Sequence, residues 1–233
     1  MPLSRRLLAE FIGTALLLAA VVGSGIMGQA LARGNDALAL LANAAATAGA
    51  LYVLVAILAP VSGAHFNPAV TLALWQRGEL GRRECAAYIA VQVAAAVCGV
   101  VLAHAMFELP LLQAGTQVRS GWPQWGSETV ATFGLLLAIL LGSRHRPASV
   151  PALVACYIFA AYWFTASTSF ANPAVTVARA FTGTFAGIRP HDVAGFVGSQ
   201  IAGVVLALAA ARLLLPVDTA RAPDAASAAS PRR

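Results

Sequence analysis

The fold is decided by a stretch that the chain contains twice. It reads His65-Phe66-Asn67-Pro68-Ala69-Val70-Thr71 in the first half and Ser169-Phe170-Ala171-Asn172-Pro173-Ala174-Val175-Thr176 in the second. In each copy asparagine is a favoured N-cap and proline is well placed at the first helical position, so each copy predicts a helix start. About ten helix-compatible residues follow, which span roughly 15 Å, half of a hydrocarbon core of about 30 Å. We therefore expect two half-helices that enter a membrane from opposite faces and meet at their N-termini.

The composition excludes an ordinary soluble domain. Of 233 residues, 59% are hydrophobic and 10% are charged, and the mean hydropathy is +0.77. The net charge of +6 comes from 15 arginines and no lysine, and the arginines lie in short clusters between apolar runs. This pattern is typical of membrane topology rather than of a nucleic-acid-binding protein, so we expect no nucleic acid partner. The cysteines have no metal-ligand spacing, and the sequence predicts neither a metal nor a cofactor.

Six apolar runs are long enough to cross a bilayer. We expect spans at about 7–31, 38–59, 85–107, 127–141, 150–166 and 192–215, with half-helices at about 68–77 and 173–181. The second span is expected to end at Pro60, since proline disrupts a helix. Residues 1–215 form the predicted channel domain, and 216–233, rich in Ala, Pro, Ser and Arg, are predicted to be a disordered cytoplasmic tail.

The basic start before the first apolar run also resembles a cleaved signal peptide. Glu10 inside that run, and its counterpart Glu128 later in the chain, argue against removal. The two glutamates belong to a larger repeat, since the halves 5–107 and 125–215 each begin with a span carrying one glutamate and end with a span carrying one glutamine. An odd number of spans in each half turns the second half over in the bilayer, which predicts an inverted repeat.

Arginine positions predict the orientation of the chain, because cytoplasmic loops of membrane proteins carry an excess of basic residues. With the N-terminus inside, eleven arginines fall on inner segments: Arg5, Arg6, Arg77, Arg82, Arg83, Arg144, Arg146, Arg212, Arg221, Arg232 and Arg233. Four fall on outer segments: Arg33, Arg119, Arg179 and Arg189. Both termini are therefore expected in the cytoplasm.

These features together resemble the aquaporin, or major intrinsic protein, family over about residues 5 to 215. The resemblance rests on the two Asn-Pro-Ala boxes 105 residues apart, the run Ser62-Gly63-Ala64-His65-Phe66-Asn67-Pro68-Ala69-Val70, and the duplicated glutamate and glutamine. It implies an all-α membrane protein with six transmembrane helices and two re-entrant half-helices in an inverted repeat. It also implies one pore per subunit and a homotetramer in the lipid bilayer.

The resemblance assigns two sets of residues to the pore, which needs polar groups because non-helical backbone at membrane depth must line a watery cavity or be buried. The midplane set is Asn67, Pro68, Ala69, Asn172, Pro173 and Ala174. The set with pore-lining carbonyls is Gly63, Ala64, His65, Thr168, Phe170 and Ala171. The asparagine amides would donate to a solute, and two helix N-termini, each with about half a positive charge, would disfavour cations.

Two interpretations compete for the buried glutamates. An ionisable group inside a membrane suggests function, and a proton-coupled transporter could use Glu10 and Glu128. Alternatively, each carboxylate accepts hydrogen bonds from the donors of one re-entrant loop. The duplicated positions favour this structural brace, and Gln92 and Gln200 are read as similar braces. His65 is also interpreted as structural rather than as a proton relay.

The expected outer constriction differs from the usual pattern of the family. Most aquaporins have an arginine after the second box, where this chain has Val175. Counting from the boxes without gaps places the other filter positions at Thr47, Ala160 and Ser169. Water-selective members have large aromatic and histidine side chains at the first two, and glycerol-conducting members often have aspartate where Thr176 stands. The sequence resembles a bacterial branch with valine after the second box, some members of which occur with arsenic-resistance genes.

The sequence thus predicts a passive channel, not an enzyme, in the inner membrane of a bacterium. The expected solutes are small and uncharged, most prominently arsenous acid, As(OH)3, and glycerol, with some water. A water-selective aquaporin is the alternative within the class, and a proton-coupled secondary transporter is the alternative outside it. An intramembrane enzyme is disfavoured, because Ser24 is flanked by glycines and has no histidine partner at helical spacing.

Overall fold

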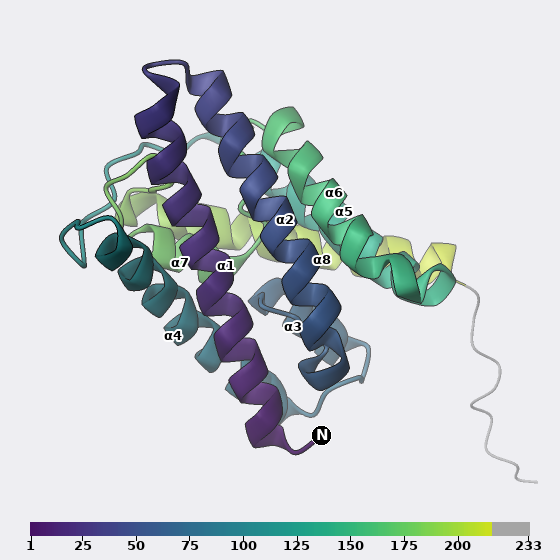
Figure 1. Ribbon diagram of the computed structural model, residues 1–233. Coiled ribbons are helices and arrows are strands. Elements are labelled where there is room, and N and C mark those ends of the chain that lie inside the picture. The colour runs from purple at the N-terminus through teal and green to yellow at the C-terminus, as the bar shows by residue number, and fades with distance from the viewer. Residues whose placement is uncertain (216–233) are drawn as a thin grey trace, which may run out of the picture.

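The computed structural model describes residues 1–215, and within that range it consists of helices and the loops that connect them (Figure 1). The α-helices are α1 (Leu3–Ala32), α2 (Asp36–Ser62), α3 (Pro68–Gln76), α4 (Arg82–Met106), α5 (Trp122–His145), α6 (Val150–Phe164), α7 (Pro173–Arg179) and α8 (Val193–Leu214). Two short 3-10 turns, Pro147–Ser149 and Pro190–Asp192, precede α6 and α8. Six helical segments are long and apolar enough to cross a membrane, with α6 counted together with the 3-10 turn before it, whereas α3 and α7 are too short. The predicted all-α architecture of six spans and two half-helices is confirmed.

The packing of the helices repeats between the two halves. Helix α1 packs against α2 and α4, and α5 packs in the same way against α6 and α8. Helices α2 and α6 pack against each other and join the halves. The short helices α3 and α7 each contact both α4 and α8, so they also connect the halves. Each contact in the first half therefore has a counterpart in the second, as an inverted repeat requires.

Glycines allow the close helix crossings that hold each half together. A side-chain carbon on Gly99 of α4 would fall within 3 Å of the backbone oxygen of Ala15 in α1. In the second half, a side-chain carbon on Gly203 of α8 would also fall within 3 Å of the backbone oxygen of Thr129 in α5. Small residues at such crossings let helix backbones approach inside a membrane. The two crossings bring each repeat's glutamate helix against its glutamine helix.

Several predicted boundaries need correction, since α1 begins at Leu3 rather than near 7 and α5 ends at His145 rather than near 141. Helix α2 continues through Pro60 to Ser62, because a proline in the last turn removes one hydrogen bond and leaves the earlier turns intact. The helix ends instead at Gly63, whose left-handed φ of 90° suits glycine and whose N–H donates to Ala59. Helix α5 begins at Trp122, earlier than expected, with Pro123 in its first turn. The predicted disordered tail, 216–233, lies outside the described residues.

The distribution of polar groups is that of a membrane protein. Large apolar side chains such as Leu16, Ile57 and Val205 are exposed on the outer surface of the helices. The glutamates and glutamines of the repeat, in contrast, are fully buried inside the bundle. Polar groups in a membrane span are expected to face the interior of the bundle or a cavity. The chain is therefore a multi-pass membrane protein whose glutamates and glutamines face the inside of a mainly apolar bundle.

Candidate functional site

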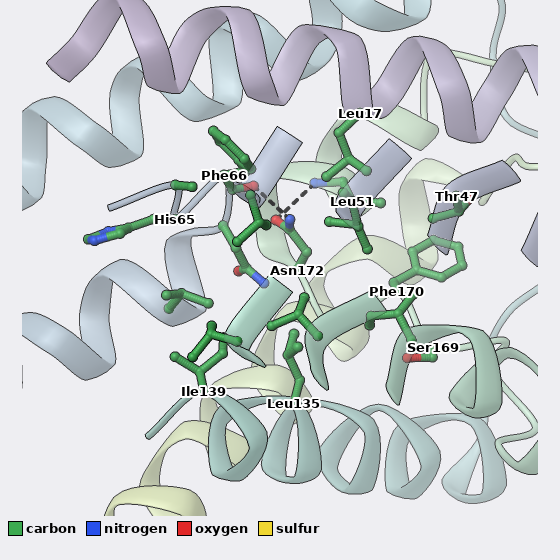
Figure 2. A pocket seen from close by; sticks show the side chains of 18 of the residues that line it. Leu17, Thr47, Leu51, His65, Phe66, Leu135, Ile139, Ser169, Phe170 and Asn172 are labelled. Carbon is green, nitrogen blue, oxygen red and sulfur yellow. Dashed lines mark hydrogen bonds between the residues drawn. The ribbon is translucent and has the colours of Figure 1, made fainter. Parts of the chain in front are cut away.

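A cavity of about 300 Å³ lies inside the ring of helices and is lined by both re-entrant loops. Figure 2 shows His65 toward one end of it, Thr47 and Ser169 toward the other, and Asn172 between them. One wall of the cavity is apolar and comes from α1, α2, α5 and α6. Six of its residues are Leu17, Val21, Leu51, Leu135, Ile139 and Val154. The two loops complete the lining with Gly63, Ala64, His65, Phe66, Ser169 and Phe170.

The two loops share an unusual backbone conformation. Left-handed φ values near 50° occur at Ala64 and Phe66 in the first loop and at Ser169 and Ala171 in the second. Such values are uncommon for residues other than glycine and persist where surrounding contacts hold them. Alternating the handedness of successive residues turns their N–H groups toward one side, where they form a concavity that binds an anion. A glutamate occupies this concavity in each loop.

In the first loop the anion is the carboxylate of Glu10. It accepts hydrogen bonds from the backbone N–H groups of His65 at 2.9 Å and Phe66 at 2.7 Å. It also accepts from the hydroxyl of Ser62 at 2.7 Å and the side-chain amide of Gln92 at 2.9 Å. Four donors around one fully buried carboxylate form the contacts expected of a structural brace.

In the second loop Glu128 has the equivalent position. Its carboxylate accepts from the N–H groups of Phe170 and Ala171, each at 2.9 Å, and from the side chain of Gln200 at 2.6 Å. The Gln200 amide nitrogen also lies 2.8 Å from the hydroxyl of Thr176, which ties the brace to the second Asn-Pro-Ala helix. Both glutamates lie behind their loops, since neither is among the residues that line the cavity.

The two asparagines connect the halves at the centre of the bundle. The side-chain oxygen of each caps its own short helix by accepting from the N–H two residues later. The amide nitrogen of Asn67 donates to the carbonyl of Ala171, and that of Asn172 donates to the carbonyl of Phe66, each at 2.8 Å. Each amide has a second N–H, and both asparagines line the cavity. One donor from each half is thus positioned to meet a solute.

The other box residues pack the helix tips together and do not line the cavity. The alanines of the two boxes, Ala69 and Ala174, are 0% exposed, and the prolines Pro68 and Pro173 are buried beside them. Their small or compact side chains allow α3 and α7 to contact each other. Only the asparagines of the six expected midplane residues reach the cavity.

The expected carbonyl set is partly placed at the cavity. Gly63, Ala64, His65 and Phe170 line it, whereas Thr168 and Ala171 do not. The carbonyl of Ala171 accepts the hydrogen bond from Asn67 instead. The hydroxyl of Thr168 lies 3.4 Å from a terminal nitrogen of Arg119, which comes from the loop between α4 and α5.

The constriction residues expected from counting need one correction. Thr47, Ser169 and Val175 line the cavity, but Ala160 lies on the exposed face of α6. Tyr162 lines the cavity in its place, and its hydroxyl donates to the hydroxyl oxygen of Thr47 at 3.3 Å. The cavity-lining residues of α6 recur every four positions: Val150, Val154, Ile158 and Tyr162. Ala160 is two positions away from that row and so points to the opposite side of the helix.

This end of the cavity is richer in hydroxyl groups than counting suggested. It contains the side chains of Thr47, Tyr162 and Ser169 beside the apolar Val175. The hydroxyl of Ser169 is buried and has no hydrogen-bond partner among residues 1–215. A hydroxyl both donates and accepts, so this group has a hydrogen-bonding capacity that the described residues do not use.

Two arginines near this end of the cavity were missed by the sequence reasoning, which placed them on outer segments. Arg179 is only 2% exposed and lines the cavity. Arg119 is partly buried next to the second loop, where it donates to the carbonyls of Ser167 and Gly187. Arg179 follows Val175 by four residues on a helix, and this spacing could have predicted from the sequence that both side chains lie on the same face.

Comparisons with known proteins agree with this architecture. The family model described as major intrinsic protein matches residues 1–166. The aquaglyceroporin AqpS of Rhizobium meliloti is 60% identical over 91% of this chain and 91% of its own length. Aquaporin PIP2-7 of Arabidopsis thaliana is 28% identical over 76% of this chain and 68% of its own. The X-ray structure of the aquaglyceroporin from Plasmodium falciparum has the same fold, with a TM-score of 0.71, 16% identity, and coverage of 91% of this chain and 97% of that one.

Proposed function

Because the chain belongs to the major intrinsic protein family, a family of channels and not of enzymes, we propose that it is a passive membrane channel for small uncharged solutes. The observation that carries this proposal is the cavity, which is lined by apolar side chains, by the two re-entrant loops and by both asparagines. A small polyol can turn its hydroxyls to the loops and asparagines and its carbon side to the apolar side chains. Hydrogen bonds to the protein then replace those that the solute loses to water along the path, and no covalent chemistry is needed.

Arsenous acid and glycerol are the solutes that the constriction fits best. Both are neutral at pH 7 and carry three hydroxyl groups on a small body. The hydroxyls of Thr47, Tyr162 and Ser169 can exchange hydrogen bonds with them in both directions, and Val175 leaves the room that an arginine would fill. The 60% identity to a protein named as an aquaglyceroporin supports the same solute class, with water as an additional permeant.

The buried glutamates favour a channel over a proton-coupled transporter. Each carboxylate is engaged by at least three donors and does not line the cavity. An intramembrane hydrolase is disfavoured as well, since the hydroxyl of Ser24 donates to the carbonyl of Ala20 and lies 2.9 Å from the amide of Asn43. A serine nucleophile needs a base within hydrogen-bond reach, and neither partner of Ser24 is one.

Orientation and assembly are part of the proposal. The bias of arginines toward one set of loops supports cytoplasmic termini in the inner membrane of a bacterium. Large apolar side chains on the outer surface, such as Leu41, Tyr52 and Ile57 of α2, give each subunit a face that can pack against lipid or against another copy. A homotetramer with one pore in each subunit is the proposed assembly.

Uptake into proteoliposomes tests the solute class. Arsenite and glycerol uptake and osmotic water flow are measured side by side, normalised to the amount of assembled protein, with protein-free vesicles as the baseline. We expect arsenite and glycerol to enter well above the baseline, accompanied by water. Water flow without either solute would contradict the proposal and favour a water-selective aquaporin.

A further inference from the structure

Arg179 is the last residue of α7 and lies one helical turn beyond Val175. Residues four apart on a helix share a face, and both side chains line the cavity. The side chain of Arg179 is 2% exposed, so its charge belongs to the interior of the protein and not to an outer loop. A guanidinium is therefore present near the constriction even though position 175 lacks one.

The guanidinium of Arg179 is held without being neutralised. Its central carbon lies 3.5 Å from the centroid of the Phe170 ring, a cation–π geometry, and its Nε donates to the carbonyl of Ala186. Within residues 1–215, no carboxylate lies within ion-pair distance of it. Its two terminal nitrogens also have no protein acceptor in that range. The guanidinium of Arg179 thus keeps its positive charge and two unused nitrogen donors, and Arg179 is one of the residues that line the cavity.

Arg119 adds a second positive charge beside the first. Its guanidinium carbon lies 5.0 Å from the same Phe170 ring, and its Nε donates to the carbonyl of Gly187 at 2.9 Å. Its backbone N–H donates to Asp192 at 2.8 Å, which fixes the loop that carries it. The carboxylate of Glu128 is committed to the donors of the second loop. Two guanidinium groups thus share one ring, and neither has a carboxylate in contact among the described residues.

We propose that Arg179, reinforced by Arg119, supplies the positive charge of the constriction, one helical turn beyond the place where most aquaporins carry it. This inference rests on the proposed channel function and adds a residue that determines its specificity. The displaced charge repels cations at the mouth formed by the second loop, while Val175 leaves the width of the pore to bulky neutral solutes. In most aquaporins one arginine both narrows the pore and supplies its positive charge. In this chain Val175 sets the width and Arg179 supplies the charge.

Guanidinium and urea form a matched pair of probes, because they have nearly the same shape and differ by one charge. Their initial uptake rates are measured in proteoliposomes containing wild-type protein, Arg179→Gln, Arg179→Lys or Arg119→Gln. Arg33→Gln is the control, since Arg33 is an exposed arginine in the α1–α2 loop. Assembly of each variant is checked first, and glycerol uptake is measured as a second neutral reference.

The guanidinium-to-urea ratio should rise about tenfold in Arg179→Gln, since one fixed charge in a low-dielectric passage changes local ion concentrations by that order. Arg119→Gln should raise it about threefold, and both Arg179→Lys and the control should stay near the wild-type ratio. An unchanged ratio in an assembled Arg179→Gln protein overturns the inference. If Arg179→Gln does not assemble, an unchanged guanidinium-to-urea ratio in Arg119→Gln overturns the inference. Wild-type vesicles that admit neither urea nor glycerol contradict the channel function itself, which is a separate outcome.

Discussion

An arginine stacks on an aromatic ring near each re-entrant loop, but only the one near the first loop is neutralised. Arg6 lies over the ring of Tyr88, which packs against His65, and pairs with Glu84 at 2.9 Å. Near the second loop, Arg179 lies over Phe170 with no carboxylate in contact within residues 1–215. The loop backbones and their glutamate braces are otherwise alike. The duplication thus provides a symmetric scaffold, whereas the charge that can select solutes is placed at one end only.

Removing a brace should have the largest effect and should affect both halves alike. Glu10→Ala and Glu128→Ala each leave two buried backbone donors and a glutamine side chain without their acceptor, at a cost of about 1–3 kcal/mol for each donor. We expect either variant to lose most assembled protein and most solute flux. Detergent-resistant assembly and glycerol uptake are the measurements. Normal assembly of one variant but not of the other would break the proposed symmetry of the scaffold.

A charge change at the midplane should have the next largest effect. Asn67→Asp and Asn172→Asp each place an anion where two helix N-termini converge, so the cation barrier should weaken. We expect the leak of a monovalent cation to rise about tenfold in vesicles that contain either variant. The two increases should be similar, because the two amides make the same bonds to opposite loops. Unchanged cation exclusion in well-assembled variants would remove both asparagines from the pore midplane.

Arginine at position 175 should affect solutes selectively. Val175→Arg adds five fixed donors and a permanent charge to the constriction. Arsenite and glycerol uptake should fall several-fold more than water permeability. The new guanidinium would lie one turn from Arg179, and like charges at that spacing repel, so Val175→Arg/Arg179→Val is the matched control for assembly. An arsenite-to-water ratio that is unchanged or higher in the assembled variant would show that Val175 does not line the constriction.

The smallest effect is expected for a single hydroxyl of the constriction. Tyr162→Phe keeps the ring and removes the group that donates to Thr47, so glycerol uptake should change by about twofold. The control is Ala160→Val, which adds volume on the exposed face of the same helix and should leave uptake unchanged. A large loss in the control with no change in Tyr162→Phe would restore the original assignment of Ala160 to the filter.

The scaffold could be predicted because its signals are local. Each asparagine caps its helix and each proline occupies the first turn, so the starts of α3 and α7 follow from three or four residues of sequence. The six spans follow from apolar length in the same way. The glutamate braces could also be predicted, because the repeat places one buried carboxylate and one re-entrant loop in each half.

The constriction could not be predicted as fully because it depends on distances along loops and on contacts between distant segments. Four residues separate α2 from Asn67 and seven separate α6 from Asn172, so counting from the boxes does not keep the register of the helix face. The four-residue periodicity that ends at Tyr162 preserves that register. Arg119 reaches the second loop from a connection about 50 residues earlier, and no local pattern in the sequence indicates this contact.

The initial rate of glycerol uptake with and without an imposed proton gradient tests the central claim most directly. For a passive channel, we predict a rate that rises linearly with the glycerol gradient, does not saturate and is the same in both conditions. Glu10→Gln should retain part of this flux, since an amide oxygen still accepts hydrogen bonds. A wild-type rate that saturates, or that rises several-fold with the proton gradient and loses this increase in Glu10→Gln, would contradict the channel and identify a proton-coupled transporter.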